Sequence, residues 1–209
     1  MFLLLCSTEI FATNHWFIAP EFQMKIRLKY GHAAESRVRE LNKLITNEQD
    51  ANEWTKINKI NNFFNTAIDY KNDLSLWGVN DYWALPIETI FRGLGDCEDY
   101  VIAKYFSLIA LGINEDKLRL MYVRHIKANE AHMVLIYLEN QKSVSLVLDN
   151  NNPDILPTHK RIDLKPIYSF NSKGVWMEKS NGLARKVNNS PGVSAWNNLI
   201  KKLILYKDL

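Results

Sequence analysis

The first half of the chain carries apolar residues at helical spacing. Between His32 and Asn47 they recur every three or four positions, which predicts an amphipathic helix. A second pattern opens at Asp50, with Glu53 three residues later as in a capped helix start, and it continues to about Ile68. Both apolar faces are interpreted as core, because such periodicity most often marks buried surface. The first 30 residues lack a clear period, and we expect them to be extended or loop.

The next segments are shorter and richer in turn residues. Residues 71–83 are polar and aromatic, which indicates a loop whose aromatic rings line a cleft. Pro86 suits the first turn of a short helix that reaches about Arg92. Gly93 and Gly95 then stop this helix and allow a sharp turn of the backbone.

An unusually apolar segment follows the two glycines. Residues 97–111 contain only Lys104 and Ser107 as polar residues after Asp99. A helix with this composition is apolar on nearly all sides, so it belongs in the interior of the protein. We therefore predict a buried helix that begins at Cys97.

Beyond Gly112 the pattern changes to short apolar runs separated by polar turns. Such runs, rich in Val, Ile, Leu and Tyr, predict antiparallel strands. The predicted strands are Leu118–Val123, Ala131–Leu138, Val144–Leu148, Ile167–Phe170 and Val175–Met177, the last two forming a hairpin. A final helix is expected from about Ser194. Helices first and strands afterwards predict an α+β fold, with the Cys97 helix packed against the sheet.

Length and composition are consistent with one globular unit. The chain has 209 residues, of which 47% are hydrophobic and 11% aromatic, enough for one substantial core. We expect a single domain over residues 21–209. The formal charge of +3 comes from 26 basic and 23 acidic residues, which is too even a balance for a nucleic-acid-binding surface, so no nucleic-acid partner is expected.

The N-terminal residues 1–20 are expected to be the remnant of an export signal or a flexible N-terminus. Residues 1–7 are apolar around Cys6 and are similar to the end of an export segment that lacks its basic start. The run is too short to span a bilayer. An ordinary apolar N-terminal strand is the alternative interpretation.

Candidate chemistry concentrates at Cys97, which is flanked by Asp96, Glu98 and Asp99. A thiol at a helix N-terminus is favoured as a nucleophile, because backbone N–H groups and the helix dipole stabilise the thiolate. The acids oppose this. A carboxylate about 6 Å from the sulfur costs roughly 3 kcal/mol at an effective dielectric near 20, or about two pKa units. A bare acidic cluster would therefore keep the thiol protonated.

Two further residues complete a candidate catalytic set. His132 starts one predicted strand and Asp149 ends the next, so antiparallel pairing would bring both to one edge of the sheet. A cysteine, a histidine and an aspartate in this arrangement are typical of papain-like nucleophilic catalysis. Each residue also has a purely structural interpretation: the cysteine as core, the histidine as incidental and the aspartate as a turn residue.

The residues quoted so far carry a family resemblance. The stretch from Asp81 to Tyr100, with Gly-Asp-Cys-Glu-Asp inside it, and the later His132-Met-Val and Leu148-Asp-Asn resemble the bacterial transglutaminase-like cysteine proteinases, in particular the LapG type. The resemblance spans about Trp54 to Met177. It implies a papain/transglutaminase-like core and a catalytic triad at Cys97, His132 and Asp149. It also implies a calcium site at Asp96, Glu98 and Asp99.

The resemblance further implies a periplasmic endopeptidase that cleaves a large surface adhesin near its N-terminus at a paired-alanine sequence, which disperses biofilm. An inner-membrane receptor for cyclic di-GMP would restrain it through its periplasmic domain. The charge argument independently favours Ca²⁺, which suits clustered carboxylates better than Mg²⁺ does. A transglutaminase-like acyltransferase and an inert calcium-binding interaction module remain as alternatives.

Overall fold

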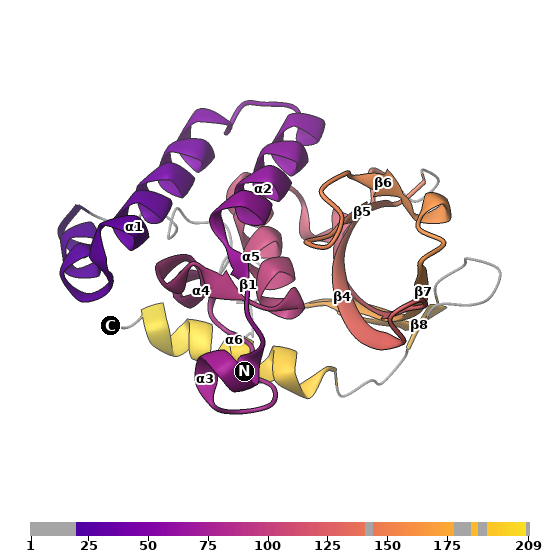
Figure 1. Cartoon of the computed structure of the whole chain (residues 1–209). Coiled ribbons are helices and arrows are strands. Elements are labelled where there is room, and N and C mark those ends of the chain that lie inside the picture. The colour runs from indigo at the N-terminus through magenta and orange to yellow at the C-terminus, as the bar shows by residue number, and fades with distance from the viewer. Residues whose placement is uncertain (1–19, 141–143, 178–184, 188–191, 208–209) are drawn as a thin grey trace, which may run out of the picture.

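Helices cover one side of a strongly curved antiparallel sheet (Figure 1). This is a computed structural model, and it describes residues 20–140, 144–177, 185–187 and 192–207. The helices are α1 Pro20–Asn47, α2 Glu53–Ala67, α3 Asp73–Trp77, α4 Pro86–Arg92, α5 Cys97–Ala110 and α6 Ser194–Lys207, with short 3-10 helices at Glu115–Lys117 and Thr158–Lys160. The strands of the main sheet are β3 Leu118–His125, β4 Glu130–Tyr137, β5 Leu146–Leu148, β6 Leu156–Pro157, β7 Leu164–Asn171, β8 Gly174–Met177 and β9 Arg185–Lys186. This arrangement confirms the predicted α+β class.

The N-terminal helix begins earlier than the sequence pattern suggested. The expectation of extended or loop structure is wrong for residues 20–30, which belong to α1. Gly31 interrupts this helix with φ 86° and ψ 178°, so the apolar period before and after it is out of phase. The start of α2 is also corrected: Asn52, and not Asp50, caps it by accepting a hydrogen bond from the N–H of Thr55 at 2.9 Å. The expectations for residues 1–19 lie outside the described residues.

The segment expected to be a loop contains the short helix α3. Asn72 caps it by accepting the N–H of Ser75 at 2.9 Å, and Gly78 ends it with φ 76°. Just before α3, strand β1 Asp69–Tyr70 pairs in parallel with strand β2 Leu94–Gly95. This two-residue ladder ties the end of α2 to the chain entering the Cys97 loop.

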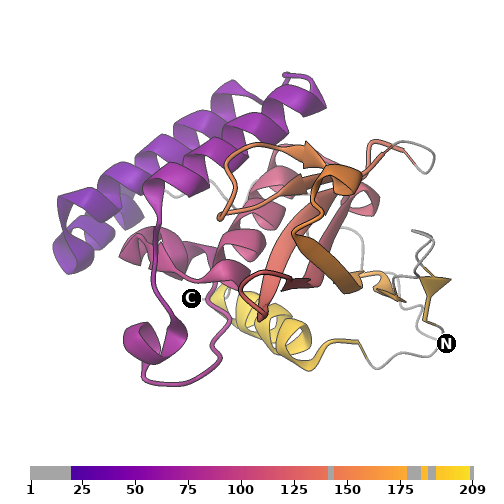
Figure 2. The same cartoon turned by 45° about the vertical axis from the view of Figure 1, so that its right-hand side comes forward.

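Helix α5 lies in the interior as predicted. In Figures 1 and 2 it runs between α2 and the sheet. Its side chains from Tyr100 to Leu108 are buried, and burying a large apolar side chain contributes about 1.5–3 kcal/mol. Lys104 and Ser107 are buried as well, so the two polar residues of this segment do not mark a solvent face.

The sheet order places β4 and β5 side by side. The strands run β6-β5-β4-β3-β7-β8-β9 and every pair is antiparallel. The β3–β7 ladder shifts register after Tyr122, where Val123 lies opposite Pro166, because proline has no N–H to donate to the ladder. β6 and β9 were not expected from the sequence. No helix among the described residues is long and apolar enough to cross a membrane.

Candidate active site

Cys97 is the first residue of α5, as predicted. Asp96 precedes the helix in an extended conformation, and its backbone N–H donates to Oδ2 of Asp99 at 3.4 Å. A side chain at Gly95 would have its Cβ 2.8 Å from Cβ of Asp99, so only glycine lets the chain pass this close. The turn therefore presents the Cys97 thiol at the helix N-terminus, where unpaired N–H groups favour negative charge.

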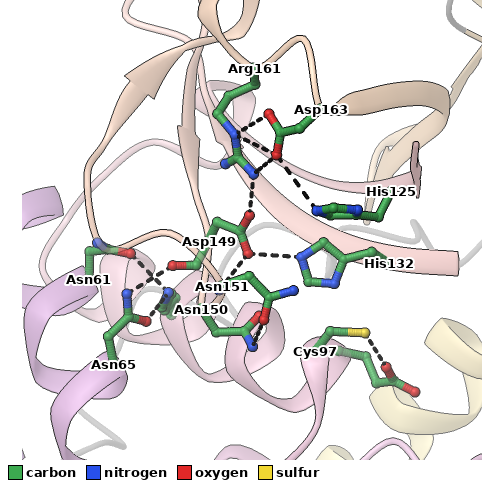
Figure 3. Close-up of polar contacts among 12 residues, drawn as sticks. Asn61, Asn65, Cys97, His125, His132, Asp149, Asn150, Asn151, Arg161 and Asp163 are labelled. Atoms are coloured by element: carbon green, nitrogen blue, oxygen red, sulfur yellow. Dashed lines mark hydrogen bonds and ion pairs between the residues drawn. The ribbon is translucent and has the colours of Figure 1, made fainter. Parts of the chain in front are cut away.

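The structure brings His132 and Asp149 together. Leu135 of β4 pairs with Leu148 of β5, and Asp149 follows directly after that strand. Its Oδ1 lies 2.8 Å from Nε2 of His132, and both side chains are buried. Because Nε2 faces the carboxylate, the other ring nitrogen, Nδ1, is left for proton exchange. Figure 3 shows that nitrogen turned toward Cys97.

Cys97 contacts the same strand. The backbone of Met133, the residue after His132, forms a hydrogen bond that favours the thiolate of Cys97. The sulfur itself donates to Oε2 of Glu98 at 3.0 Å (Figure 3). Among the described hydrogen bonds, the thiol proton of Cys97 is therefore donated to Glu98 and not to His132. His132 thus lies between Asp149 and Cys97, as the sequence predicted (Figure 3), while the thiol proton of Cys97 is directed to Glu98.

Arg161 is a site residue that sequence reasoning missed. Its Nη2 donates to Oδ2 of Asp149 at 2.7 Å, and the arginine also pairs with Asp163. Nε2 of His125 lies 3.9 Å from Oδ2 of Asp163 (Figure 3). Burial acts to raise the pKa of Asp149, but the contacts with His132, Asn151 and Arg161 lower it to about 2. Asp149 is therefore ionised throughout the neutral range.

A carboxylate cluster lies beside the thiol, with a membership that differs from the predicted one. Asp73, Asp96 and Glu98 have oxygens that all lie within 4.8 Å of one another. Asp99 instead accepts hydrogen bonds from the backbone N–H groups of Ala84 at 2.9 Å and Asp96 at 3.4 Å. Its role as a ligand stays a prediction. Sequence reasoning missed Asp73 because a loop and helix α4 separate its helix, α3, from Cys97 along the chain. The only local sign of Asp73 in the sequence is its position directly after Asn72, which caps α3.

Burial and mutual repulsion shape the titration of this cluster. Burial, together with the charges of Glu98 and Asp99, raises the pKa of Asp96 to about 9. Burial raises the pKa of Cys97, and the charge and hydrogen bond of Glu98 raise it further. Among the described residues, Oδ1 of Asp73 and Oδ1 of Asp96 are buried without a hydrogen-bond partner. Such orphaned carboxyl oxygens fit a site for a hard divalent cation, whose binding would displace the protons that burial and repulsion favour.

Comparisons with known proteins show which proteins the chain resembles in sequence and fold. The chain superposes on calcium-bound LapG of Legionella pneumophila with a TM-score of 0.75 and 34% identity, covering 89% of this chain and 99% of that one. For EGTA-treated LapG of the same organism the TM-score is 0.74 and the identity 35%, over 89% and 98% of the two chains. A search of curated proteins gave no significant match. The family model for the bacterial transglutaminase-like cysteine proteinases matches residues 29–178. Because that match covers most of the chain and includes the cysteine, histidine and aspartate described above, the protein belongs to the bacterial transglutaminase-like cysteine proteinase family.

Proposed function

We propose that this protein is a calcium-dependent cysteine endopeptidase with a catalytic triad of Cys97, His132 and Asp149. The observation that carries the proposal is the buried 2.8 Å contact between His132 Nε2 and Asp149 Oδ1 next to a cysteine at a helix N-terminus. A histidine oriented by a carboxylate and facing a thiol is the arrangement that nucleophilic acyl transfer needs. Family membership supports peptide hydrolysis as the reaction.

Each residue then has a defined task. Nδ1 of His132 accepts the proton of Cys97, and the thiolate attacks the peptide carbonyl. Backbone N–H groups at the start of α5 stabilise the oxyanion. His132 next gives its proton to the leaving amine, while Asp149 holds the ring and stabilises its cationic form. A water molecule, activated by the same histidine, hydrolyses the thioester and frees the enzyme.

Asp73, Asp96 and Glu98 would hold the calcium ion, with Asp99 as a further predicted ligand. The orphaned oxygens of Asp73 and Asp96 support this assignment, because calcium requires many oxygen ligands. Bound calcium supplies positive charge that offsets the carboxylates around the sulfur. The existence of a calcium-bound LapG structure is consistent with such a site in the family.

The proposed substrate is a large surface adhesin, cleaved in its N-terminal region at a paired-alanine sequence, so that cleavage promotes biofilm release. The proposed location is the periplasm, and the proposed regulator is the periplasmic domain of an inner-membrane cyclic di-GMP receptor. The support for these three points is the similarity to LapG-type proteinases over 89% of the chain.

The test is to incubate the protein with candidate adhesin fragments and to map the new termini by mass spectrometry. We expect cleavage with added Ca²⁺, none in excess chelator, and recovery when Ca²⁺ is restored. Cys97→Ala should abolish turnover and leave the circular dichroism spectrum unchanged. Full activity in chelator would contradict the calcium dependence, and an active Cys97→Ala variant would contradict the triad. Adding a primary amine and finding conjugated product in place of hydrolysis would favour the acyltransferase alternative.

A further inference from the structure

Lys104 is a charged residue in the interior of α5 that the reaction described above does not use. It lies seven residues after Cys97, which places it on nearly the same helix face about 10 Å further along the axis. Its side chain is fully buried. Burial lowers the pKa of Lys104 to about 7, against the opposing influence of Asp149. Burying a charged lysine costs free energy unless its ammonium group is hydrogen-bonded, so the partners of Lys104 must offset that cost.

The ammonium group of Lys104 donates to two asparagine side chains of α2. The distances are 2.8 Å to Oδ1 of Asn61 and 2.7 Å to Oδ1 of Asn65. The ammonium form of lysine can only donate, and the neutral amine still has two N–H groups for these two contacts, so each amide turns its oxygen toward Nζ and its NH₂ group away. Lys104 therefore fixes the orientation of both amides.

The two NH₂ groups point to the loop that carries Asp149. Asn65 donates to the backbone carbonyl of Asp149 at 2.8 Å, and Asn61 donates to that of Pro153 at 2.9 Å. These carbonyls belong to the first residue and to a later residue of the loop 149–155 between β5 and β6, and Figure 3 shows both asparagines beside it. The side chain of Asp149 is held separately by Arg161 and by the N–H of Asn151.

We propose that Lys104 is a positioning residue for the active site, which acts through Asn65 and Asn61 to fix the main chain at Asp149. The inference rests on the triad proposed above. Without the lysine, either amide can rotate and present its oxygen to a carbonyl oxygen, which would repel the loop. Asp149 would then hold the His132 ring less firmly, and the thiol of Cys97 would lose its base.

The experiment measures the rate at which iodoacetamide alkylates Cys97 near neutral pH with Ca²⁺ in excess, with the modified residue identified by mass spectrometry. His132→Ala reports whether the thiolate depends on the histidine. We expect Lys104→Met and Asn65→Ala each to slow alkylation by about tenfold, and the double variant to be no slower than the more affected single one, because both changes break one linkage.

Lys56→Met is the matched control. Lys56 is a buried lysine like Lys104, but it lies on α2. Its ammonium group donates to the carbonyl of Leu111, the residue that caps the C-terminus of α5, at 2.7 Å. It lies nine residues before Asn65, about 13 Å along the helix. Its loss should lower the melting temperature as Lys104→Met does, yet change the alkylation rate by less than about twofold.

The outcomes separate the two proposals. A slow His132→Ala variant together with a Lys104→Met variant at the wild-type rate would overturn the positioning role and leave the triad standing. A His132→Ala variant at the wild-type rate would overturn both. Losses that multiply in the double variant would show that Lys104 does not act through Asn65. If Lys104→Met does not fold, Asn65→Ala provides the test alone, because Asn65 is only half-buried and its replacement should be tolerated. An unchanged alkylation rate in Asn65→Ala would then overturn the inference.

Discussion

Replacing Arg161 by methionine tests how strongly the carboxylate of Asp149 depends on its cationic partner. Nη2 of Arg161 lies 2.7 Å from Oδ2 of Asp149, and the side chains are only 4% and 0% exposed. Removing one partner of a buried ion pair leaves an uncompensated charge, at a cost of about 3–5 kcal/mol. In a chain of this size each kcal/mol lowers the melting temperature by roughly 2–4 °C. We therefore expect Arg161→Met to melt roughly 6–20 °C below the wild type.

The effect should also depend on pH. The pKa of Asp149 is about 2 against an ordinary 3.8, because its hydrogen bonds and the charges nearby outweigh its burial. A lowered carboxyl pKa stabilises the fold above the pKa of the unfolded chain, and this contribution disappears as the pH falls toward 2. The difference of 1.8 units (3.8 − 2) corresponds to roughly 2 kcal/mol. Without Arg161 the pKa of Asp149 rises, so the stability difference between the variant and the wild type should be largest at neutral pH and shrink as the pH falls from about 4 toward 2.

Urea unfolding followed by tryptophan fluorescence at pH 7 and at pH 2.5, which lies inside the window between 3.8 and about 2, measures both effects. Arg124→Met is the control, because Arg124 is exposed and donates to the exposed side chain of Asn129. Its free energy of unfolding should stay within about 0.5 kcal/mol of the wild type. A variant Arg161→Met that unfolds at the wild-type urea concentration at pH 7 would refute the reasoning, since the buried pair would then carry no net stability.

Two further predictions concern the chain around Cys97. Asp73→Asn should raise the Ca²⁺ concentration needed for half-maximal activity by about tenfold or more. Asp116→Asn is the control, because Asp116 forms an exposed ion pair with a lysine, and it should leave that concentration unchanged. Equal calcium requirements in the two variants would show that Asp73 is not a ligand. Gly93→Ala should destabilise the protein in urea unfolding by at least about 1 kcal/mol more than Gly112→Ala. Both glycines have positive φ, but only at Gly93 would a Cβ meet another side chain, 2.5 Å from Cζ of Arg37. Equal losses would show that the arginine moves aside freely.

The arrangement of Cys97, His132 and Asp149 was predictable because local and topological signals agree at these residues. Two glycines before a mostly apolar segment indicated a buried helix with Cys97 at its start. The prediction that His132 and Asp149 would meet assumed that their two strands pair as neighbours, because antiparallel neighbours bring the start of one strand to the end of the next; that pairing is confirmed. Both inferences needed only the chain order and the period of the pattern.

The supporting residues were not predictable in the same way. Arg161 lies in a polar segment without a period, and only the packed structure shows that it reaches Asp149. Asp73 joins Asp96 and Glu98 through the folding of α3, in a segment that aromatic and turn residues made resemble a loop. Lys104 was visible as an exception in an apolar helix, but its partners come from another helix, and the periodicity of a single segment carries no information about them.

The hydrogen bond from Cys97 to Glu98 also bears on how the sulfur withstands oxidants. Peroxides attack the thiolate much faster than the neutral thiol, and over-oxidation to the sulfinic or sulfonic acid is irreversible. In the arrangement described here the sulfur is protonated and shares its proton with a carboxylate. The carboxylates that keep Cys97 protonated therefore also protect its sulfur from oxidation. Loss of the thiol proton, which would make Cys97 reactive toward a peptide, would also expose it to irreversible oxidation.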